Sequence, residues 1–358
     1  MNHAARLDAA RAAMGRAQVE AMLVSGLVNI RYLTGFTGSN ALVVIGPDTA
    51  TLLTDFRYQT ASEPLRAWVD VELAERDVIR TAAERLDGLT GGALRVGFEP
   101  AQMTVERYAL LDEWHERLMP VPGLIEGLRI VKDAEELDAV RAAAALIEPV
   151  YARLAGEGLT GREEIEVAWH VRELFHEGGA DGLAFETIVA SHERGAQPHA
   201  HPGHDRIGAD TLITIDLGCV LDGYCSDCTR TFATGTPPPA LAEAYRICLE
   251  AQLAAMAAVK PGARASDVDG AARDVIAAAG HGEHFGHPVG HGVGLDIHES
   301  PRLGATTSAT LEPGMVVTVE PGIYVPGIGG VRIEDLVIVT PTGGERLTMY
   351  PKDLSVVG

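Results

Sequence analysis

The sequence has no apolar segment long enough to cross a membrane and no recognisable export signal. No apolar run approaches the roughly 20 residues that a transmembrane helix needs. The first residues are charged and alanine-rich, and they lack the continuous apolar core of a signal peptide. We therefore expect a cytoplasmic protein without a membrane partner.

Positive charge is scarce. The chain has 29 Lys and Arg residues against 50 Asp and Glu residues, a formal net charge of -21 at pH 7. A nucleic-acid partner needs clustered basic side chains, so this balance argues against one. Hydrophobic residues make up 46% and charged residues 22% of the 358 residues. These proportions are typical of a soluble globular protein, and the length favours two domains.

Cysteine is scarce as well, with four residues: Cys219, Cys225, Cys228 and Cys248. Cys225 and Cys228 form a C-x-x-C pair, a spacing found in redox sites and in zinc sites. In a strand their Cα atoms would lie about 10 Å apart on opposite faces, which is too far for a disulfide. No second C-x-x-C completes a zinc site. We expect small buried thiols in a reducing compartment.

The residue patterns predict two domains. Residues 1–125 read as a small α/β domain, and residues 126–358 as a larger α+β domain whose antiparallel strands are covered by paired helices. The junction lies in "PVPGLIEGLR", where prolines and glycines cluster. Asp133 is the expected N-cap of one long helix over residues 133–155. Further predicted helices cover residues 4–18, 56–66, 77–87, 104–117, 161–179, 239–258 and 266–279.

Five residues that bind hard metal ions stand in short apolar stretches of the second domain. Burying a lone carboxylate is costly unless the group is paired or bound to a metal. Any one of the five would be an ordinary charged residue at a strand end. Together they favour convergence on one divalent metal pair, with hydrolysis as its use. They are Asp216, Asp227, His291, Glu320 and Glu334.

The spacings of these residues fit two hairpins. Asp222-Gly223, between the two aspartates, is a strong signal for a two-residue turn. Direct or diagonal pairing across that hairpin puts both carboxylates on one face. Glu320 and Glu334 are an even number of residues apart, so their hairpin needs an odd-length loop or a bulge, which "PGIGG" can form. His291 stands between two glycines, where the backbone can approach an ion closely.

These motifs resemble the pita-bread metallopeptidases, the family of methionine aminopeptidase, aminopeptidase P and prolidase. "PHAHP", "DLGCVLDGYCSDCTRT", "GHGVGLDIHE", "VEPGIY" and "VRIED" resemble the catalytic domain. "NIRYLTGFTGSNALVVI" and "LLTDFRY" resemble the N-terminal domain shared by aminopeptidase P, prolidase and creatinase. The resemblance implies a pita-bread catalytic domain after a creatinase-like domain. It disfavours methionine aminopeptidase, and also creatinase, which lacks the metal ligands.

The resemblance also implies auxiliary residues. His199 and His298 match histidines that contact the substrate and the reaction intermediate. His287 matches a third active-site histidine of the proline-specific branch, and Arg332 an arginine beside the metal site. The stretch "SHERGAQPH" departs from the Gly-Pro-Asn-Ser sequence usual before His199, which leaves the local substrate contacts open.

The implied activity is removal of the first residue from peptides with proline in second position, as in aminopeptidase P. The catalytic residues would be His199, His298, Glu320, His287 and Arg332, with Glu320 accepting the proton of the attacking water. Two divalent ions are expected, manganese first and cobalt or zinc as alternatives. A homodimer is also expected from the resemblance. The alternatives are a prolidase, which cleaves Xaa-Pro dipeptides, a catalytically silent binding protein, and a creatinase-like amidinohydrolase.

Overall fold

The computed structural model describes residues 1–75 and 77–358, which form two compact units. The first spans Met1–Arg129 and the second Ile130–Gly358. The division falls after Arg129, not after residue 125, because a short helix occupies the expected junction. In that helix, α6 (Leu124–Arg129), Ile125 is buried, and Glu126 accepts a hydrogen bond from Asn29 Nδ2 at 2.8 Å.

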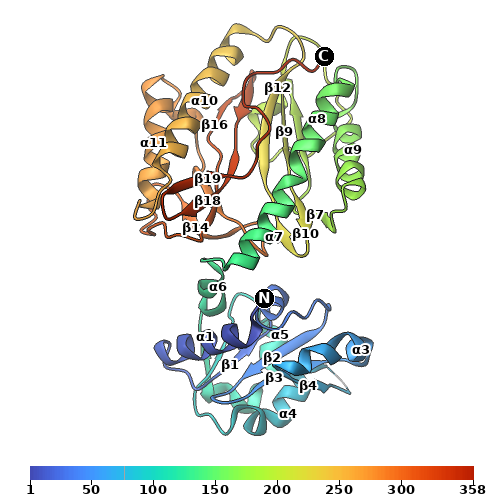
Figure 1. Cartoon of the computed structure of the whole chain (residues 1–358), viewed down its shortest axis with the longest axis vertical. Helices are drawn as coiled ribbons and strands as arrows, with labels where there is room; N and C mark the ends of the chain where they lie inside the picture. The colour runs from blue at the N-terminus through green and yellow to red at the C-terminus, as the bar shows by residue number, and fades with distance from the viewer. Residues whose placement is uncertain (76) are drawn as a thin grey trace. The chain divides into compact units, whose positions relative to one another are not determined.

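The first unit is built on one mixed six-stranded sheet (Figure 1). Its strand order is β4-β3-β2-β1-β5-β6, with β2 antiparallel to both of its neighbours and the remaining pairs parallel. The central strands are buried along their whole length, as their apolar runs predict. Helix α4 packs Ile79, Ala82 and Leu86 against one face. The strands are β1 (Ala21–Val24), β2 (Ala41–Ile45), β3 (Ala50–Thr54), β4 (Asp70–Leu73), β5 (Val96–Phe98) and β6 (Leu118–Pro120).

The helices of this unit follow the predicted ones with two interruptions. The segment predicted as one helix over residues 56–66 is divided into a 3₁₀ helix, a four-residue α-helix and a second 3₁₀ helix. The segment at 104–117 is broken between an α-helix and a 3₁₀ helix. The elements are α1 (His3–Arg16), α2 (Leu27–Thr34), η1 (Phe56–Tyr58), α3 (Gln59–Ser62), η2 (Glu63–Ala67), α4 (Val78–Thr90), α5 (Val105–Ala109) and η3 (Asp112–Arg117).

The second unit begins with a helix that is shorter than predicted. Asp133 caps it as expected, in a capping box with Glu136. The single helix over residues 133–155 is wrong, because the chain breaks at Leu146 into α7 (Ala134–Ala145) and α8 (Ile147–Glu157). The cause is Pro149, which has no N–H to donate and whose ring would collide with the carbonyl one turn earlier in a continuous helix.

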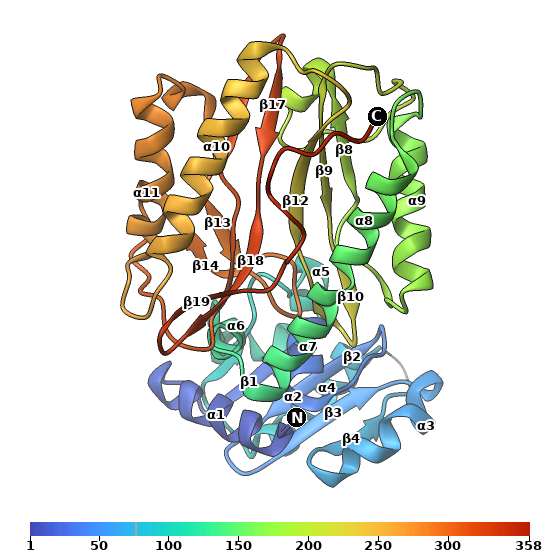
Figure 2. The same cartoon turned by 45° about the horizontal axis from the view of Figure 1, so that its top comes forward.

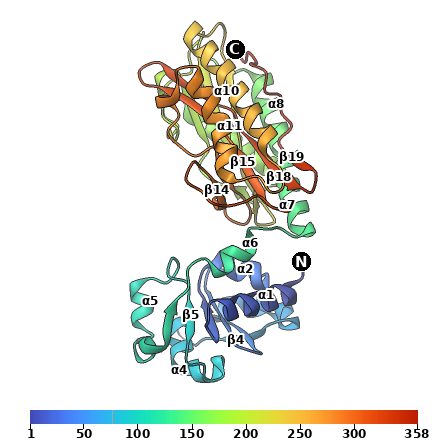
Figure 3. The ribbon, with the colours of Figure 1, turned by 90° about the vertical axis from the view of Figure 1, so that its left-hand side faces the viewer.

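Two helix pairs enclose the strands of this unit. Figure 2 shows α8 and α9 on one side, α10 and α11 on the other, and the strands between them. Figure 3 shows α10 and α11 lying side by side. Each pair covers its own core: Tyr151 and Phe175 pack against Ile215, whereas Ala251 and Ile276 pack against strands that include Val317. The helices are α9 (Glu164–Glu177), α10 (Pro239–Ala258), α11 (Ala265–Ala278), η4 (His192–Ala196) and η5 (Gly282–His284).

The strands of the second unit form a sheet in each half and two smaller sheets that extend them. The first half has the order β12-β9-β8 and the second β14-β13-β15-β18-β19. This arrangement of paired helices around antiparallel strands is the pita-bread fold expected from the sequence. The strands are β7 (Gly182–Leu183), β8 (Ile188–Ser191), β9 (Leu212–Leu217), β10 (Cys219–Leu221), β11 (Tyr224–Cys225), β12 (Cys228–Ala233), β13 (Gly290–Gly292), β14 (Glu299–Leu303), β15 (Val316–Val319), β16 (Gly322–Val325), β17 (Gly329–Arg332), β18 (Asp335–Thr340) and β19 (Gly343–Arg346).

The four cysteines are free and buried, as the sequence predicts. Burial raises the pKa of the Cys225 thiol to about 12, so it stays protonated near neutral pH. No helix among the described residues is long and apolar enough to cross a membrane.

Gly218 tests how tightly the β9–β12 hairpin is packed. A Cβ atom there would lie 2.1 Å from the carbonyl oxygen of Ser226, a backbone atom that cannot move aside cheaply. Gly218→Ala is therefore expected to lower the free energy of unfolding by about 1–3 kcal/mol in urea titrations. The control is Gly270→Ala in α11, where a Cβ meets nothing within 4 Å. It should raise stability by roughly 0.5–1 kcal/mol. Equal effects of the two substitutions would contradict this packing.

Candidate metal centre

Three buried carboxylates converge where the two halves of the second unit meet. Asp216 lies in β9, Asp227 just before β12, and Glu334 just before β18. Each offers an oxygen, and these oxygens all lie within 4.8 Å of one another. Three residues from distant parts of the sequence therefore form one negatively charged cluster.

The first hairpin places the two aspartates. Asp222 and Gly223 both have positive φ, 49° and 83°, as the expected two-residue turn requires. The pairing that follows sets Asp216 opposite Thr229, two residues beyond Asp227 on the same strand. The aspartates are thus diagonal neighbours on one face, one of the two arrangements that the spacing allows.

The second hairpin places the two glutamates. Val325 pairs with Gly329, which leaves a loop with an odd number of residues, as the even spacing requires. The same register resumes at Val319 and Asp335, so Glu320 and Glu334 stand opposite each other where the ladder is interrupted. At that interruption the backbone N–H groups change partners: Glu320 N donates to Val289 O at 2.7 Å, and Glu334 N donates to Thr229 O at 3.1 Å. The second bond joins the two halves directly at the cluster.

His291 completes the group of five. Its Nε2 lies 3.3 Å from Glu320 Oε1 and 3.6 Å from Asp227 Oδ2. Its Nδ1 is 3.0 Å from Gly292 O, which favours a proton on Nδ1 and leaves Nε2 as the ligand atom. Both neighbouring glycines are required, since a Cβ on Gly290 would lie 2.0 Å from Thr318 O. All five predicted ligands therefore lie together.

The charges of the centre are poorly compensated. Burial, followed by repulsion from the other carboxylates, raises the pKa of Asp227 and of Glu334 well above the usual range. Burial also raises the pKa of Asp216, although Arg332 opposes this. Burial would raise the pKa of Glu320 too, but the hydrogen bond and charge of His291 outweigh it and lower that pKa to about 2.

Two carboxylate oxygens of the cluster, Asp216 Oδ1 and Glu334 Oε1, are buried without a hydrogen-bond partner among the residues that the structure describes. A buried acceptor without a partner is costly, and a native protein retains one where a ligand or ion satisfies it. Four carboxylates and one imidazole are a donor set that suits divalent ions. The residues therefore fit a divalent metal site.

Arg332 connects the cluster to residues around it. Its Nη2 donates to Asp216 Oδ2 at 2.8 Å, and its Nε donates to Thr229 Oγ1, which donates to Glu334 Oε2. Its Nη1 donates to Tyr324 Oη at 3.1 Å. Arg332 thus orients two of the carboxylates through a single buried guanidinium.

Tyr324 was not foreseen from the sequence. Its hydroxyl lies 2.9 Å from His287 Nε2, and His287 Nδ1 lies 2.8 Å from Pro288 O. A proton on Nδ1 makes Nε2 the acceptor of the tyrosine proton. A hydrogen-bonded path therefore runs from His287 through Tyr324 and Arg332 to the carboxylate of Asp216. In the sequence Tyr324 is the last residue of the motif "VEPGIY", but nothing in that motif indicates that its hydroxyl bridges His287 and Arg332.

His298 lies beside the cluster on an exposed turn. Its ring is 4.5 Å from that of His291, edge to face, and burial together with the charge of His291 lowers its pKa. The next residue, Glu299, forms a buried ion pair with Lys132 at 2.8 Å and accepts a hydrogen bond from Asp296 N. The ion pair and the hydrogen bond of Glu299 therefore fix the turn that carries His298.

His199 is exposed on the segment that follows η4. Burial lowers the pKa of both His287 and His298, and the charge of His199 is among the smaller contributions to that lowering. His201 and His204 are exposed and pair with other carboxylates, His201 with Glu186 at 3.4 Å and His204 with Glu163 at 2.8 Å.

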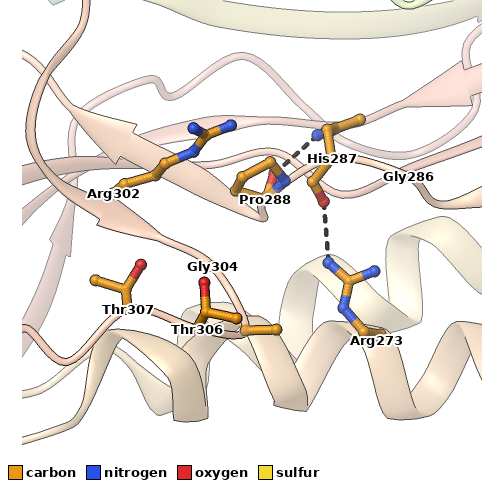
Figure 4. A pocket seen from close by; sticks show the side chains of 9 residues that line it. Arg273, Gly286, His287, Pro288, Arg302, Gly304, Thr306 and Thr307 are labelled. Atoms are coloured by element: carbon orange, nitrogen blue, oxygen red, sulfur yellow. Dashed lines mark hydrogen bonds between the residues drawn. The ribbon is translucent and has the colours of Figure 1, made fainter.

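A pocket of about 510 Å³ adjoins His287 (Figure 4). Two arginines line it. The guanidinium of Arg273 is fully engaged, with Asp269 and with the carbonyls of Phe285 and His287. Arg302 is exposed and makes no hydrogen bond or ion pair with any residue that the structure describes, and Figure 4 draws no hydrogen bond from it. The remaining residues that line the pocket are Gly286, Pro288, Gly304, Ala305, Thr306 and Thr307.

Comparison with known proteins gives matches to both units. Residues 137–341 match the model of metallopeptidase family M24, and residues 6–131 match that of the creatinase/prolidase N-terminal domain. An Xaa-Pro dipeptidase of Pyrococcus furiosus is 34% identical over 95% of this chain and 97% of its own.

Solved structures are similar over nearly the whole chain. The Xaa-Pro dipeptidase from Bacillus anthracis superposes with a TM-score of 0.96, at 37% identity, over 99% of this chain and 100% of its own. The X-Pro aminopeptidase from Thermotoga maritima superposes with a TM-score of 0.86, at 30% identity, over 96% and 99%.

Metal binding is expected to stabilise the folded chain, because cations would relieve the repulsion among the three clustered carboxylates. Millimolar Mn²⁺ should raise the melting temperature of chelator-treated protein, and elemental analysis should find two ions per chain. Asp227→Asn should lower bound metal below two ions and reduce the shift. A matched exposed change, Asp138→Asn, should alter neither value. Identical metal content and melting shifts in all three proteins would contradict the site.

Proposed function

This chain belongs to metallopeptidase family M24, and from that membership we propose that it is a metal-dependent Xaa-Pro dipeptidase. The observation that carries the proposal is the guanidinium of Arg302, which lies in the pocket beside His287 and has no hydrogen-bond or ion-pair partner among the described residues. A dipeptidase must bind the carboxylate that directly follows the proline of its substrate, and a fixed cation does this best.

The other arginines of the catalytic motifs are already paired. Arg194 pairs with Glu164, Arg230 with Asp335, and Arg332 with Asp216. Arg302 has no such partner among the described residues, and it is close enough to His298 to contribute to lowering the pKa of that imidazole. A carboxylate bound to Arg302 would therefore lie next to both His287 and His298.

The sequence alone favours an aminopeptidase, because no arginine of the catalytic motifs is an obvious carboxylate clamp, although Arg31 or Arg57 of the first unit could serve. Arg302 supplies a candidate, and the names of the relatives from P. furiosus and B. anthracis are in line with it. The similarity to the X-Pro aminopeptidase from T. maritima supports an aminopeptidase as the second candidate function. In that case the substrates of this chain would be peptides of three or more residues.

We assign the divalent ions to the five clustered residues, with manganese as the expected metal and cobalt or zinc as alternatives. Bound ions supply Lewis acidity, which polarises the scissile carbonyl and makes water acidic near neutral pH. Asp216 and Asp227 approach from one half of the unit; His291, Glu320 and Glu334 approach from the other.

Glu320 is the proposed proton carrier. Its Oε1 accepts from Thr318 Oγ1 at 3.1 Å and faces His291 Nε2, so Oε2 is the oxygen assigned to accept the proton of the attacking water. The same atom would return that proton to the proline nitrogen, which carries no hydrogen in the intact bond.

The histidines complete the proposed site. His199 and His298 hold the substrate and stabilise the oxyanion, and His287 is oriented for contact by Tyr324. The homodimer and the cytoplasmic location stay predictions from the sequence.

Substitution of the exposed histidines separates catalysis from metal binding. His199→Ala and His298→Ala should each keep two ions per chain and lower kcat by roughly 10²–10³-fold, the usual effect of losing one oxyanion donor. His204→Ala is the control, since that side chain pairs with Glu163 at the surface. Near-normal turnover in both of the first variants would show that these roles are misassigned.

The substrate length tests the role of Arg302. The wild-type chain should have a higher kcat/KM for Ala-Pro than for Ala-Pro-Ala. Arg302→Met should raise KM for Ala-Pro by roughly 10–100-fold, which corresponds to the loss of one charged hydrogen bond. It should change KM for Ala-Pro-Ala little. The KM of Arg302→Lys for Ala-Pro should lie between those of the wild type and Arg302→Met. The control Arg246→Met, at an exposed position, should have the KM of the wild type. A wild-type preference for Ala-Pro-Ala would instead favour the aminopeptidase.

A further inference from the structure

His199 lies within a surface segment, residues 192–203, that we name the His199 loop. The loop starts after Ser191 at the end of β8, passes through η4, and ends at Gly203. Apart from η4, the backbone of the loop forms no helix or strand. An exposed imidazole there therefore needs support from outside the loop to keep one position.

Glu164, the first residue of α9, lies directly behind this loop. Its side chain is fully buried, although a carboxylate is rarely buried without strong partners. Oε1 accepts from Ser191 N at 2.9 Å and from Ser191 Oγ at 3.0 Å. Oε2 accepts from Arg194 Nε at 2.8 Å and from Gly203 N at 3.4 Å. These donors stand on both sides of His199 in the sequence, so one carboxylate closes the loop.

The loop is also held from the side of the metal centre. Arg332 Nη1 donates to Pro198 O at 3.0 Å, directly before His199. Arg194, which is bound to Glu164, also holds the backbone after His199: its Nη2 donates to His201 O, two residues further on. The backbone on either side of the imidazole is therefore tied to the buried Glu164 and to the metal-linked Arg332.

We propose that Glu164 is a positioning residue for the Xaa-Pro peptidase reaction, acting on the substrate only through His199. This inference rests on the proposed function. Glutamine cannot replace the carboxylate, because its NH₂ group would face N–H donors where Glu164 presents an oxygen. Glutamine leaves intact the two backbone hydrogen bonds that also join α9 to this segment, Glu164 N to Asp205 O and Ile165 N to Gly203 O.

The decisive experiment is a double-mutant cycle with Glu164→Gln and His199→Ala. Glu164→Gln alone should lower kcat for Ala-Pro about tenfold or more, as expected when a catalytic group is displaced by a fraction of an ångström. In the His199→Ala background the same change should lower kcat by less than about twofold, because its target is gone. Glu163→Gln is the matched control: this neighbouring carboxylate binds His204 and Arg206, outside the loop, and should leave kcat unchanged.

Equal losses in both backgrounds, or no loss in either, would overturn the proposal. If Glu164→Gln does not fold, Arg194→Met tests the same contact in the same cycle, and Arg194→Lys should recover part of kcat. Histidine NMR gives a readout that needs no activity: the Cε1–H resonance of His199 should shift in Glu164→Gln and not in Glu163→Gln. An unmoved resonance would contradict the positioning role. A wild-type chain that cleaves no Xaa-Pro peptide, yet shows the shift, would refute the proposed function and leave the anchoring intact.

Discussion

Repulsion among buried carboxylates is the constraint that organises the second unit. Asp216, Asp227 and Glu334 lie within a few ångströms of one another and away from water; Arg332 forms an ion pair with Asp216, and His291 Nε2 lies 3.6 Å from Asp227 Oδ2. Such a cluster raises the free energy of the empty fold, so the surrounding structure must hold it in place. Both hairpins are built around it, and the hydrogen bond from Glu334 N to Thr229 O joins their two halves at that point.

The same constraint separates two kinds of residue. The proposed metal ligands lie in or next to strands, where register and packing determine their direction. The exposed histidines lie on turns, and each turn is anchored by an ion pair. Buried Glu164 pairs with the partly exposed Arg194 behind His199, and buried Lys132 pairs with buried Glu299 beside His298. Strands thus provide a rigid centre, while the histidines that we propose to face the substrate lie on segments that can differ without disturbing it.

The sequence predicts the features that depend on local chemistry. The turn at Asp222-Gly223, the odd loop after Val325 and the N-cap at Asp133 follow from residue type and spacing, and the structure has each of them. The hairpin of β13 and β14 was missed, because its glycines around His291 are typical of a loop and its pairing depends on distant strands. The break at Leu146 is not predicted, because the apolar pattern is helical on both sides of it and only Pro149 interrupts that pattern.

Contacts between residues far apart in the sequence could not be predicted from it. Nothing local shows that Tyr324 bridges His287 and Arg332, or that Arg302 alone among the motif arginines lacks a partner in the described structure. That last observation shifts the proposed activity from an aminopeptidase to a dipeptidase.

Anomalous diffraction from crystals soaked in Mn²⁺ tests the central claim most directly. The account predicts two manganese peaks about 3.5–4 Å apart, coordinated by Asp216, Asp227, His291, Glu320 and Glu334. The absence of any peak at this cluster in the presence of millimolar Mn²⁺, or a peak held by other residues, would contradict it.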